Sequence, residues 1–225
     1  MNINGFVEYA HISPQFVILL SSILVWVLAR VVQSTVALQK ADINESEFVP
    51  AVSRYLAAGN IEAGAKECDK RSEAAMSRST KTLLKLLKIG CESPMIAVEE
   101  SMASVRPRVM KGIDTLAALA NLATLVGLVG TVVGLINAFA SAGGMDANKK
   151  AEFLSKSISE AMYNTFSGLA IAVLALFFHM LLAHKAKSIL ERAEGALFQL
   201  VNVHAQYKKG YRPPETAAPA ASSAR

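Results

Sequence analysis

The most regular feature of the chain is the alternation of long apolar runs with charged segments. Three runs contain no Asp, Glu, Lys or Arg: residues 10–29, 115–145 and 161–184. A helix needs roughly 20 mostly apolar residues to cross about 30 Å of hydrocarbon. Each run is long enough. The pattern therefore predicts an all-α membrane protein with three transmembrane helices, over residues 14–38, 113–140 and 160–184.

The segment between the first two runs, residues 39–112, predicts a cytoplasmic helical loop. Apolar residues recur at helical spacing in 53–65 and in 76–89, and Gly59-Asn60 marks a turn between them. Ser93 followed by Pro94 is typical of a helix start. That helix runs towards the second span, and Pro107 predicts a kink or a break in it.

Two interpretations of the basic stretch 76–89 stay open at this stage. It can pack in a helical bundle, which we favour, or lie on the inner membrane surface as an amphipathic helix. The remaining segments are an external N-terminus (1–13), a short external loop (141–159) and a helix extending into the cytoplasm (185–210). The Pro/Ala/Ser-rich end, residues 211–225, predicts disorder.

Composition agrees with a membrane class, and the basic residues predict the orientation. The chain is 52% hydrophobic and 18% charged. Residues 40–112 hold twelve of the 23 Lys and Arg, and the chain from 185 onward holds seven. Basic residues accumulate on the cytoplasmic side, which predicts a cytoplasmic C-terminus and an N-terminus outside. No basic residue precedes the first run, so we expect an uncleaved anchor rather than a signal peptide.

Several functional classes find little support in the sequence. The net charge of +5 is explained by topology, and no nucleic-acid-binding motif accompanies it. Cys68 and Cys91 have no second Cys or His at metal spacing, which predicts reduced thiols and neither a metal nor another cofactor. The spans contain no nucleophile–base pair, so we do not expect an enzyme.

Small residues interrupt the second span at regular intervals. In LVGLVGTVVGLINAF the glycines are Gly127, Gly130 and Gly134, which fall on one helix face. Helices in lipid associate through close packing of small residues, since lipid tails are as apolar as leucine. These glycines therefore predict packing of the second span against another helix.

Polar residues form a second pattern in the two later spans. Asn121, Thr124 and Thr131 follow one stripe of span two with Leu128, Leu135 and Ala138, and span three carries Glu160, Asn164 and Thr165 near Gly168. Intramembrane polar groups are expensive and often mark an ion pathway. They also serve ordinary helix packing, and an interfacial Glu160 has a structural interpretation. The residues by themselves leave both possibilities open.

Two motifs resemble those of the MotA/TolQ/ExbB proton-channel family. ANLATLVGLVGTVVGLINAF is similar to the family's second span, and ISEAMYNTFSGLAIAVLAL to its third. Three spans resemble ExbB and TolQ more than MotA. The chain departs from the family pattern where Thr124 and Leu174 replace prolines.

The resemblance implies a homopentameric ring in a bacterial inner membrane, with the N-terminus in the periplasm, whose spans two and three face a central pore. The pore would hold the single membrane helix of a TolR/ExbD-like partner, whose aspartate carries the proton. The resemblance assigns Thr131 and Thr165 as pore threonines and Glu160 as the span-three glutamate. Asn121, Thr124 and Asn164 join them as candidate pore-lining residues. Gly127, Gly130, Gly134 and Gly168 are the expected packing residues.

Two functions from different classes follow. One is the channel-forming subunit of a proton-driven motor, which converts proton flow into mechanical work through the partner. The other is a non-conducting membrane scaffold that recruits partners through its cytoplasmic helices. The motor requires the polar stripe, whereas the scaffold tolerates apolar substitution there.

Overall fold

The computed structural model describes residues 14–91 and 93–208, and every regular element in these ranges is a helix. The predicted N-terminal segment 1–13 and the predicted disordered tail 211–225 lie outside the described residues. The helices are α2 (Pro14–Ala41), α3 (Glu45–Ala57), α4 (Ile61–Asp69), α5 (Ala75–Ile89), α6 (Pro94–Ala103), α7 (Arg106–Met110), α8 (Ile113–Ala142) and α9 (Ala147–Lys208). The all-α fold class is confirmed.

Three of these helices are long and apolar enough to cross a membrane: α2, α8 and α9. This confirms the three predicted spanning helices as elements of the fold. The ends differ from the expectation. Residues 147–159 are the first turns of α9, so the segment between α8 and α9 is only Gly143–Asp146 instead of 141–159.

The described residues form two compact units. The spanning unit contains the chain up to Ala37 and Met110–Lys185, and the bundle unit contains Leu38–Val109 and the chain from Ala186 onward. Both α2 and α9 contribute residues to each unit.

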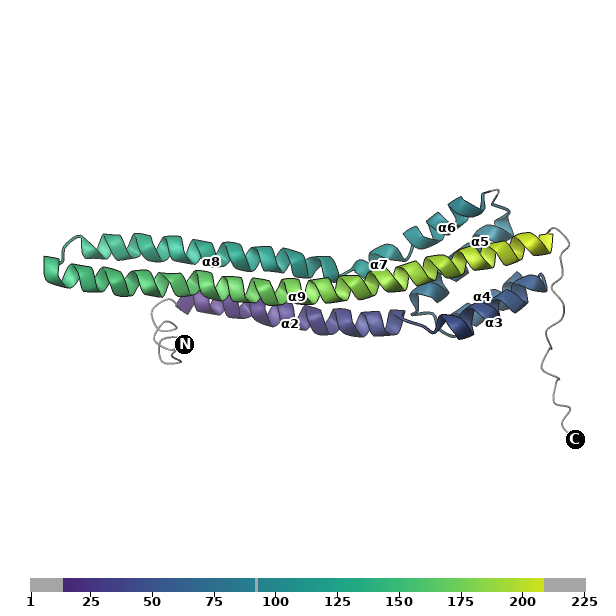
Figure 1. Ribbon diagram of the computed structural model, residues 1–225, viewed down its shortest axis with the longest axis horizontal. Helices are drawn as coiled ribbons and strands as arrows, with labels where there is room; N and C mark the ends of the chain where they lie inside the picture. Colours follow the sequence, from purple (N-terminus) through teal and green to yellow (C-terminus); the bar gives the residue numbers. More distant parts are fainter. Residues whose placement is uncertain (1–13, 92, 209–225) are drawn as a thin grey trace, which may run out of the picture. The chain divides into compact units, whose positions relative to one another are not determined.

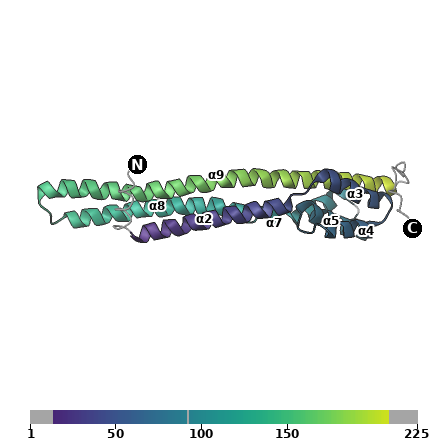
Figure 2. The same ribbon diagram turned by 90° about the horizontal axis from the view of Figure 1, so that it is seen from below.

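In the spanning unit, α8 lies alongside the first part of α9, and α2 lies next to them (Figures 1 and 2). One face of α2 is buried through Leu20, Ile23 and Val27, which recur at steps of three and four. Its other faces expose large apolar side chains such as Val25 and Trp26. A helix that buries one apolar stripe and exposes others fits a lipid environment.

A polar contact also joins α2 to α8. The Arg30 guanidinium donates to Thr115 Oγ1 at 3.3 Å, and its Nε is buried without a hydrogen-bond partner. Gly112, directly before α8, has φ +95, a conformation that favours glycine. An added Cβ there would lie 3.1 Å from Ser34 Oγ, so the α7–α8 junction is both turned and close to α2.

The bundle unit is built from short helices that pack in succession. α3 packs against α4, α4 against α5, and α5 against α6. Asn44 and Asn60 begin α3 and α4, each accepting a backbone N–H with its side chain. The turn at Gly59, with φ +74, is where Gly59-Asn60 predicted it.

The packing of α5 decides between the two interpretations of 76–89. Leu83 and Leu84 are fully buried in the bundle unit, whereas Lys85 and Lys88 are exposed. The packed-bundle interpretation is therefore the one that the structure supports.

The predicted break near Pro107 is present, with its position refined. α6 begins at Pro94 after Ser93, as predicted, and ends at Ala103. Pro107 lies in the first turn of the short α7, where its missing N–H costs little. The chain thus turns twice before the second span, once after Ala103 and again at Gly112.

Candidate functional site

The candidate site is the seam between α8 and α9, and glycines bring the two backbones together there. An added Cβ at Gly168 would lie 2.6 Å from the Ala123 carbonyl oxygen and 2.9 Å from Gly127 Cα. An added Cβ at Gly127 would lie 2.9 Å from the Asn164 carbonyl oxygen. Backbone atoms cannot step aside as side chains do, so both positions require glycine at this helix separation.

The other two glycines of α8 continue the seam towards the loop that joins α8 to α9. An added Cβ at Gly130 would lie 2.8 Å from Cγ of Asn164, and one at Gly134 would lie 3.0 Å from Cβ of Ala161. Asn164 is only 1% exposed, because it fills the space that Gly130 leaves. The candidate residue Asn164 therefore lies within the seam.

Two threonine hydroxyls meet across the seam. Thr165 Oγ1 lies 3.2 Å from Thr131 Oγ1 and 3.2 Å from the Gly127 carbonyl oxygen. Thr131 Oγ1 donates to the carbonyl of Leu128, 2.6 Å away within its own helix, which leaves its lone pair available to Thr165. Both side chains are half-buried. They form a short chain of hydroxyls at the edge of the seam.

The polar stripe on α8 is not uniformly exposed. Asn121 and Leu128 are exposed, Thr124, Thr131 and Leu135 are half-buried, and Ala138 is buried. Steps of three and four leave two neighbouring rows on a helix. The row of Thr124, Thr131 and Ala138 lies nearer the glycines, and Thr124 bonds the Ala120 carbonyl at 3.1 Å in its own helix.

Glu160 lines a hollow of about 430 Å³ between α8 and α9 near the loop. Its side chain is 19% exposed, and its carboxylate lies 4.0 Å from the ammonium of Lys156. The hollow is also lined by Asn137 and Ser141 of α8 and by Ser157 of α9. Glu160, Asn164 and Thr165 follow one another along α9, so the polar groups continue from this hollow to the threonine pair.

The sequence reasoning did not single out Lys156, Asn137, Ser141 and Ser157. A signal was present, since Asn137 and Ser141 continue the face of Gly130 and Gly134 by steps of three and four. Ser157 likewise precedes Asn164 by two turns on α9. Ser141, Lys156 and Ser157 were missed because the loop was expected to cover residues 141–159.

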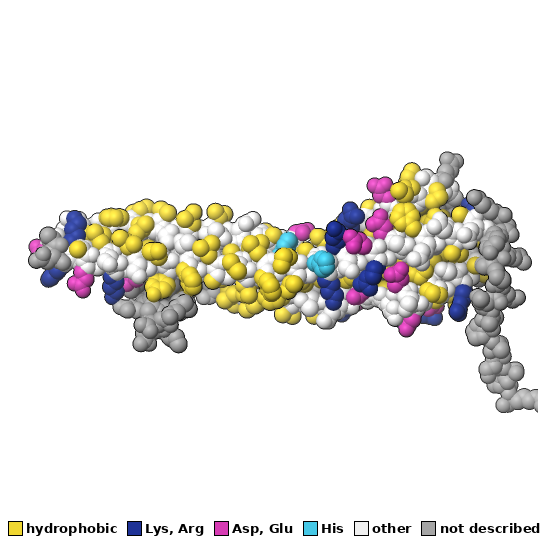
Figure 3. Space-filling model, viewed as in Figure 1, with side chains coloured by type: hydrophobic (Ala, Val, Ile, Leu, Met, Phe, Trp, Pro, Cys, Tyr) yellow, Lys and Arg dark blue, Asp and Glu magenta, His cyan; other side chains and the backbone are white. Residues whose placement is uncertain are grey.

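Outside the seam, the surface of α8 and the neighbouring part of α9 is mostly hydrophobic, and charged side chains gather at the loop (Figure 3). Leu125, Val129 and Ile136 of α8 and Phe166 and Val173 of α9 are exposed. This distribution is typical of helices that face lipid or other membrane helices.

The titratable groups of the bundle unit point to no chemistry of their own. Burial raises the pKa of the Cys68 thiol to about 11, so the thiol is neutral at neutral pH. Among the described residues, no group of three or more His, Cys, Asp or Glu could hold a metal ion.

Comparison with known families decides what kind of protein carries this seam. The profile of the MotA/TolQ/ExbB proton channel family matches residues 70–195, more than half of the chain. The chain belongs to this family. No curated protein matches it in a sequence search.

Family membership and the three apolar helices together identify an integral membrane protein of the proton-channel type. The family match covers α5 to α8 and α9 as far as residue 195, so it includes the whole seam. It leaves out α2, α3 and α4.

Proposed function

We propose that this chain is the channel-forming subunit of a proton-driven motor in a bacterial inner membrane, closest to ExbB and TolQ. Its partner is a single-span TolR/ExbD-like protein with an aspartate in its membrane helix. Proton flow past that aspartate drives mechanical work. The observation that carries the proposal is the contact between the Thr165 and Thr131 hydroxyls at the edge of the glycine seam.

The threonine pair is suited to a proton path because it is polar, half-buried and braced by backbone carbonyls. A hydroxyl both donates and accepts, so it can pass hydrogen bonds along a chain of water and side chains. Asn121, on the same stripe of α8, is exposed. An amide facing lipid is unfavourable. A further helix covering this face would meet both Asn121 and the threonines.

The proton carrier has to come from that further helix. Residues 115–145 and 161–184 contain no Asp or Glu, and Glu160 lies at the loop end of the seam. A carboxylate in the middle of the membrane is therefore the partner's contribution. Each proton that crosses releases about 2.3 kcal/mol per 100 mV of membrane potential, which several protons can sum into a conformational stroke.

The assembly we propose is a homopentameric ring around the partner's helices, with α8 and α9 lining the pore. Because the glycines let α8 and α9 pack closely, the two helices of each subunit would form a continuous section of the pore wall. The orientation follows the basic residues, with the bundle unit in the cytoplasm and the α8–α9 loop in the periplasm. The spans we propose are α2, α8 and the part of α9 from about Glu160 to His184, about 25 residues, which suffices for the hydrocarbon.

Native mass spectrometry of the complex in lipid nanodiscs tests this proposal. The chain is expressed alone and together with a one-span protein encoded next to it. We expect five copies of this chain, holding fewer copies of the partner when it is present. A monomer or dimer that retains no partner would contradict the motor and favour the scaffold.

A further inference from the structure

The hollow at the loop end of the seam combines a carboxylate with several neutral oxygens. Glu160 shares it with the side chains of Asn137, Ser141 and Ser157. Carboxylate, amide and hydroxyl oxygens are the ligands that hard metal cations take in proteins. By donor type alone, this hollow suits a sodium ion.

Lys156 makes cation binding in this hollow unfavourable. Its ammonium lies 4.0 Å from the Glu160 carboxylate and lines the same hollow. An alkali cation bound to Glu160 would sit within a few ångströms of this positive charge, and like charges at that distance repel strongly in a partly dry site. The ammonium itself supplies the positive charge that the Glu160 carboxylate would otherwise take from a bound cation.

Lys156 also lines a second hollow. This hollow, of about 450 Å³, lies at the loop and is lined by Gly144, Met145 and Asp146. Phe153 and Lys156 line both hollows. In the second one, the lining residues Asp146 and Glu152 are matched by Lys149 and Lys156, so acidic and basic groups are equal in number there. The Lys156 ammonium therefore contributes positive charge to both hollows.

We propose that Lys156 is a specificity-determining residue, whose ammonium keeps sodium and other alkali cations out of the Glu160 hollow. The exposed position of Lys156 on α9 makes it replaceable without loss of packing. The consequence for transport rests on the proposed function, because only an ion pathway needs selectivity. The ion preference of the hollow itself is measurable without any transport.

The test is hydrogen–deuterium exchange of the full chain in lipid nanodiscs, read over residues 137–160, in sodium chloride against choline chloride at equal ionic strength. The variants are Lys156→Met, Lys156→Arg and the double variant Lys156→Met/Glu160→Gln. If sodium binds only the folded, exchange-protected state of this region, sodium at twice its dissociation constant lowers the amide exchange rate about threefold. We expect this slowing in Lys156→Met, and no effect of sodium in the wild type, in Lys156→Arg or in the double variant.

Two results would overturn the inference. One is slowing by sodium in the wild type, which would mean that Lys156 does not exclude the ion. The other is no response to sodium in Lys156→Met, which would mean that the hollow holds no cation even without the ammonium. Proton flux is measured on the same variants to test the proposed function separately. A complex without proton flux would contradict the motor, whereas the result on sodium binding would still stand.

Discussion

The hydroxyl of Thr165 lies 3.2 Å from the hydroxyl of Thr131, on the neighbouring helix of the same chain. The contact exists because Gly127 and Gly168 let the two backbones approach closely just beside it. One turn further towards the loop, the buried Asn164 fills the space beside Gly130. The close backbone packing of α8 and α9 and their polar side chains therefore lie in the same seam.

Removing either hydroxyl tests the role of the pair. Valine keeps the shape of threonine, so Thr131→Val and Thr165→Val should assemble normally, at a cost of about 0.6 kcal/mol for a lost hydrogen bond in a membrane. We expect at least about a tenfold loss of partner-dependent proton flux, equivalent to about 1.4 kcal/mol in the barrier. Thr165→Ser, which retains the hydroxyl, is the matched control and should stay near wild type. Unchanged flux in both valine variants would remove the pair from the pathway.

The glycine seam makes a prediction about stability. In Gly168→Ala the new methyl would overlap the Ala123 carbonyl oxygen and Gly127 Cα, so we expect a loss of about 1–3 kcal/mol. Gly195→Ala, in the same helix, adds a methyl that meets no atom within 4 Å. It should stabilise the chain by about 0.4–1 kcal/mol by restricting the unfolded state. Unfolding in mixed detergent micelles measures both, and equal effects of the two variants would contradict the packing.

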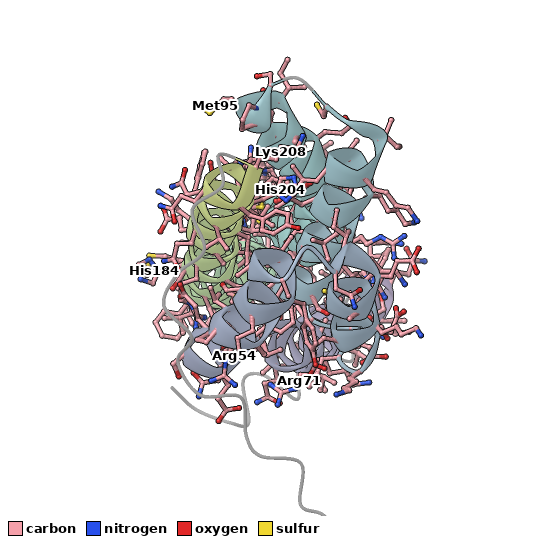
Figure 4. The ribbon with its side chains drawn as sticks, turned by 90° about the vertical axis from the view of Figure 1, so that its right-hand side faces the viewer. Arg54, Arg71, Met95, His184, His204 and Lys208 are labelled. Carbon is pink, nitrogen blue, oxygen red and sulfur yellow. The ribbon has the colours of Figure 1, made fainter. Side chains whose placement is uncertain are left out.

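His204 predicts how stability depends on pH. It is buried in the bundle unit (Figure 4), and neither ring nitrogen has a hydrogen-bond partner. Burial, with a smaller contribution from Lys208, lowers its pKa below the ordinary value of 6.5. Well above pH 6.5, His204 is neutral in both the folded and the unfolded chain, so its titration does not affect stability there. As the pH falls through 6.5, the unfolded chain takes up a proton before the folded chain does, so stability falls.

The matched variant is His204→Phe, which keeps an aromatic ring without titratable nitrogens. We expect wild type to lose more stability than His204→Phe between neutral pH and about pH 5.5, a window that opens at the ordinary histidine pKa. Amide exchange within α5 and the last turns of α9 reports on this unit. Parallel pH profiles for the two proteins would mean that folding leaves the pKa of His204 unchanged, which would contradict the lowering by burial.

The two thiols should differ in reactivity. Cys68 is buried and its pKa of about 11 leaves about one thiol in ten thousand ionised at pH 7. Cys91 is only half-buried. A maleimide should therefore label Cys91 first and reach Cys68 only when the bundle unit opens. Labelling of Cys91→Ser at the rate of a free thiol in the native state would contradict the burial of Cys68.

Much of the fold was predictable because hydrophobicity and turn chemistry are local. Three uncharged runs predicted three long helices, and Gly59-Asn60 and Ser93-Pro94 marked real boundaries. The start of α9 at Ala147 was missed, since Lys149, Lys150 and Lys156 made that stretch resemble a loop. The turn at Gly112 was also missed, because an isolated glycine before an apolar run does not reveal a positive φ.

The site was predictable in its residues but not in its pairings. The spacing of Gly127, Gly130 and Gly134 indicated a packing face, yet it could not show that Gly168 and Asn164 lie opposite. Thr131 and Thr165 are 34 residues apart, and their contact depends on the relative register of α8 and α9. Register follows from tertiary packing, which a single sequence does not contain. Lys156 and Glu160, by contrast, lie four residues apart on one helix, and this local pair was missed because the loop was expected to extend to residue 159.

Proton flux into liposomes tests the central claim most directly. The chain is reconstituted alone and with a one-span protein of the proposed partner type, and a pH-sensitive dye inside the vesicles follows an imposed gradient. Because residues 115–145 and 161–184 lack a carboxylate, we expect little flux from the chain alone and a large increase with the partner, lost again in Thr131→Val/Thr165→Val. Strong flux from the chain alone, or no increase with the partner, would contradict the account.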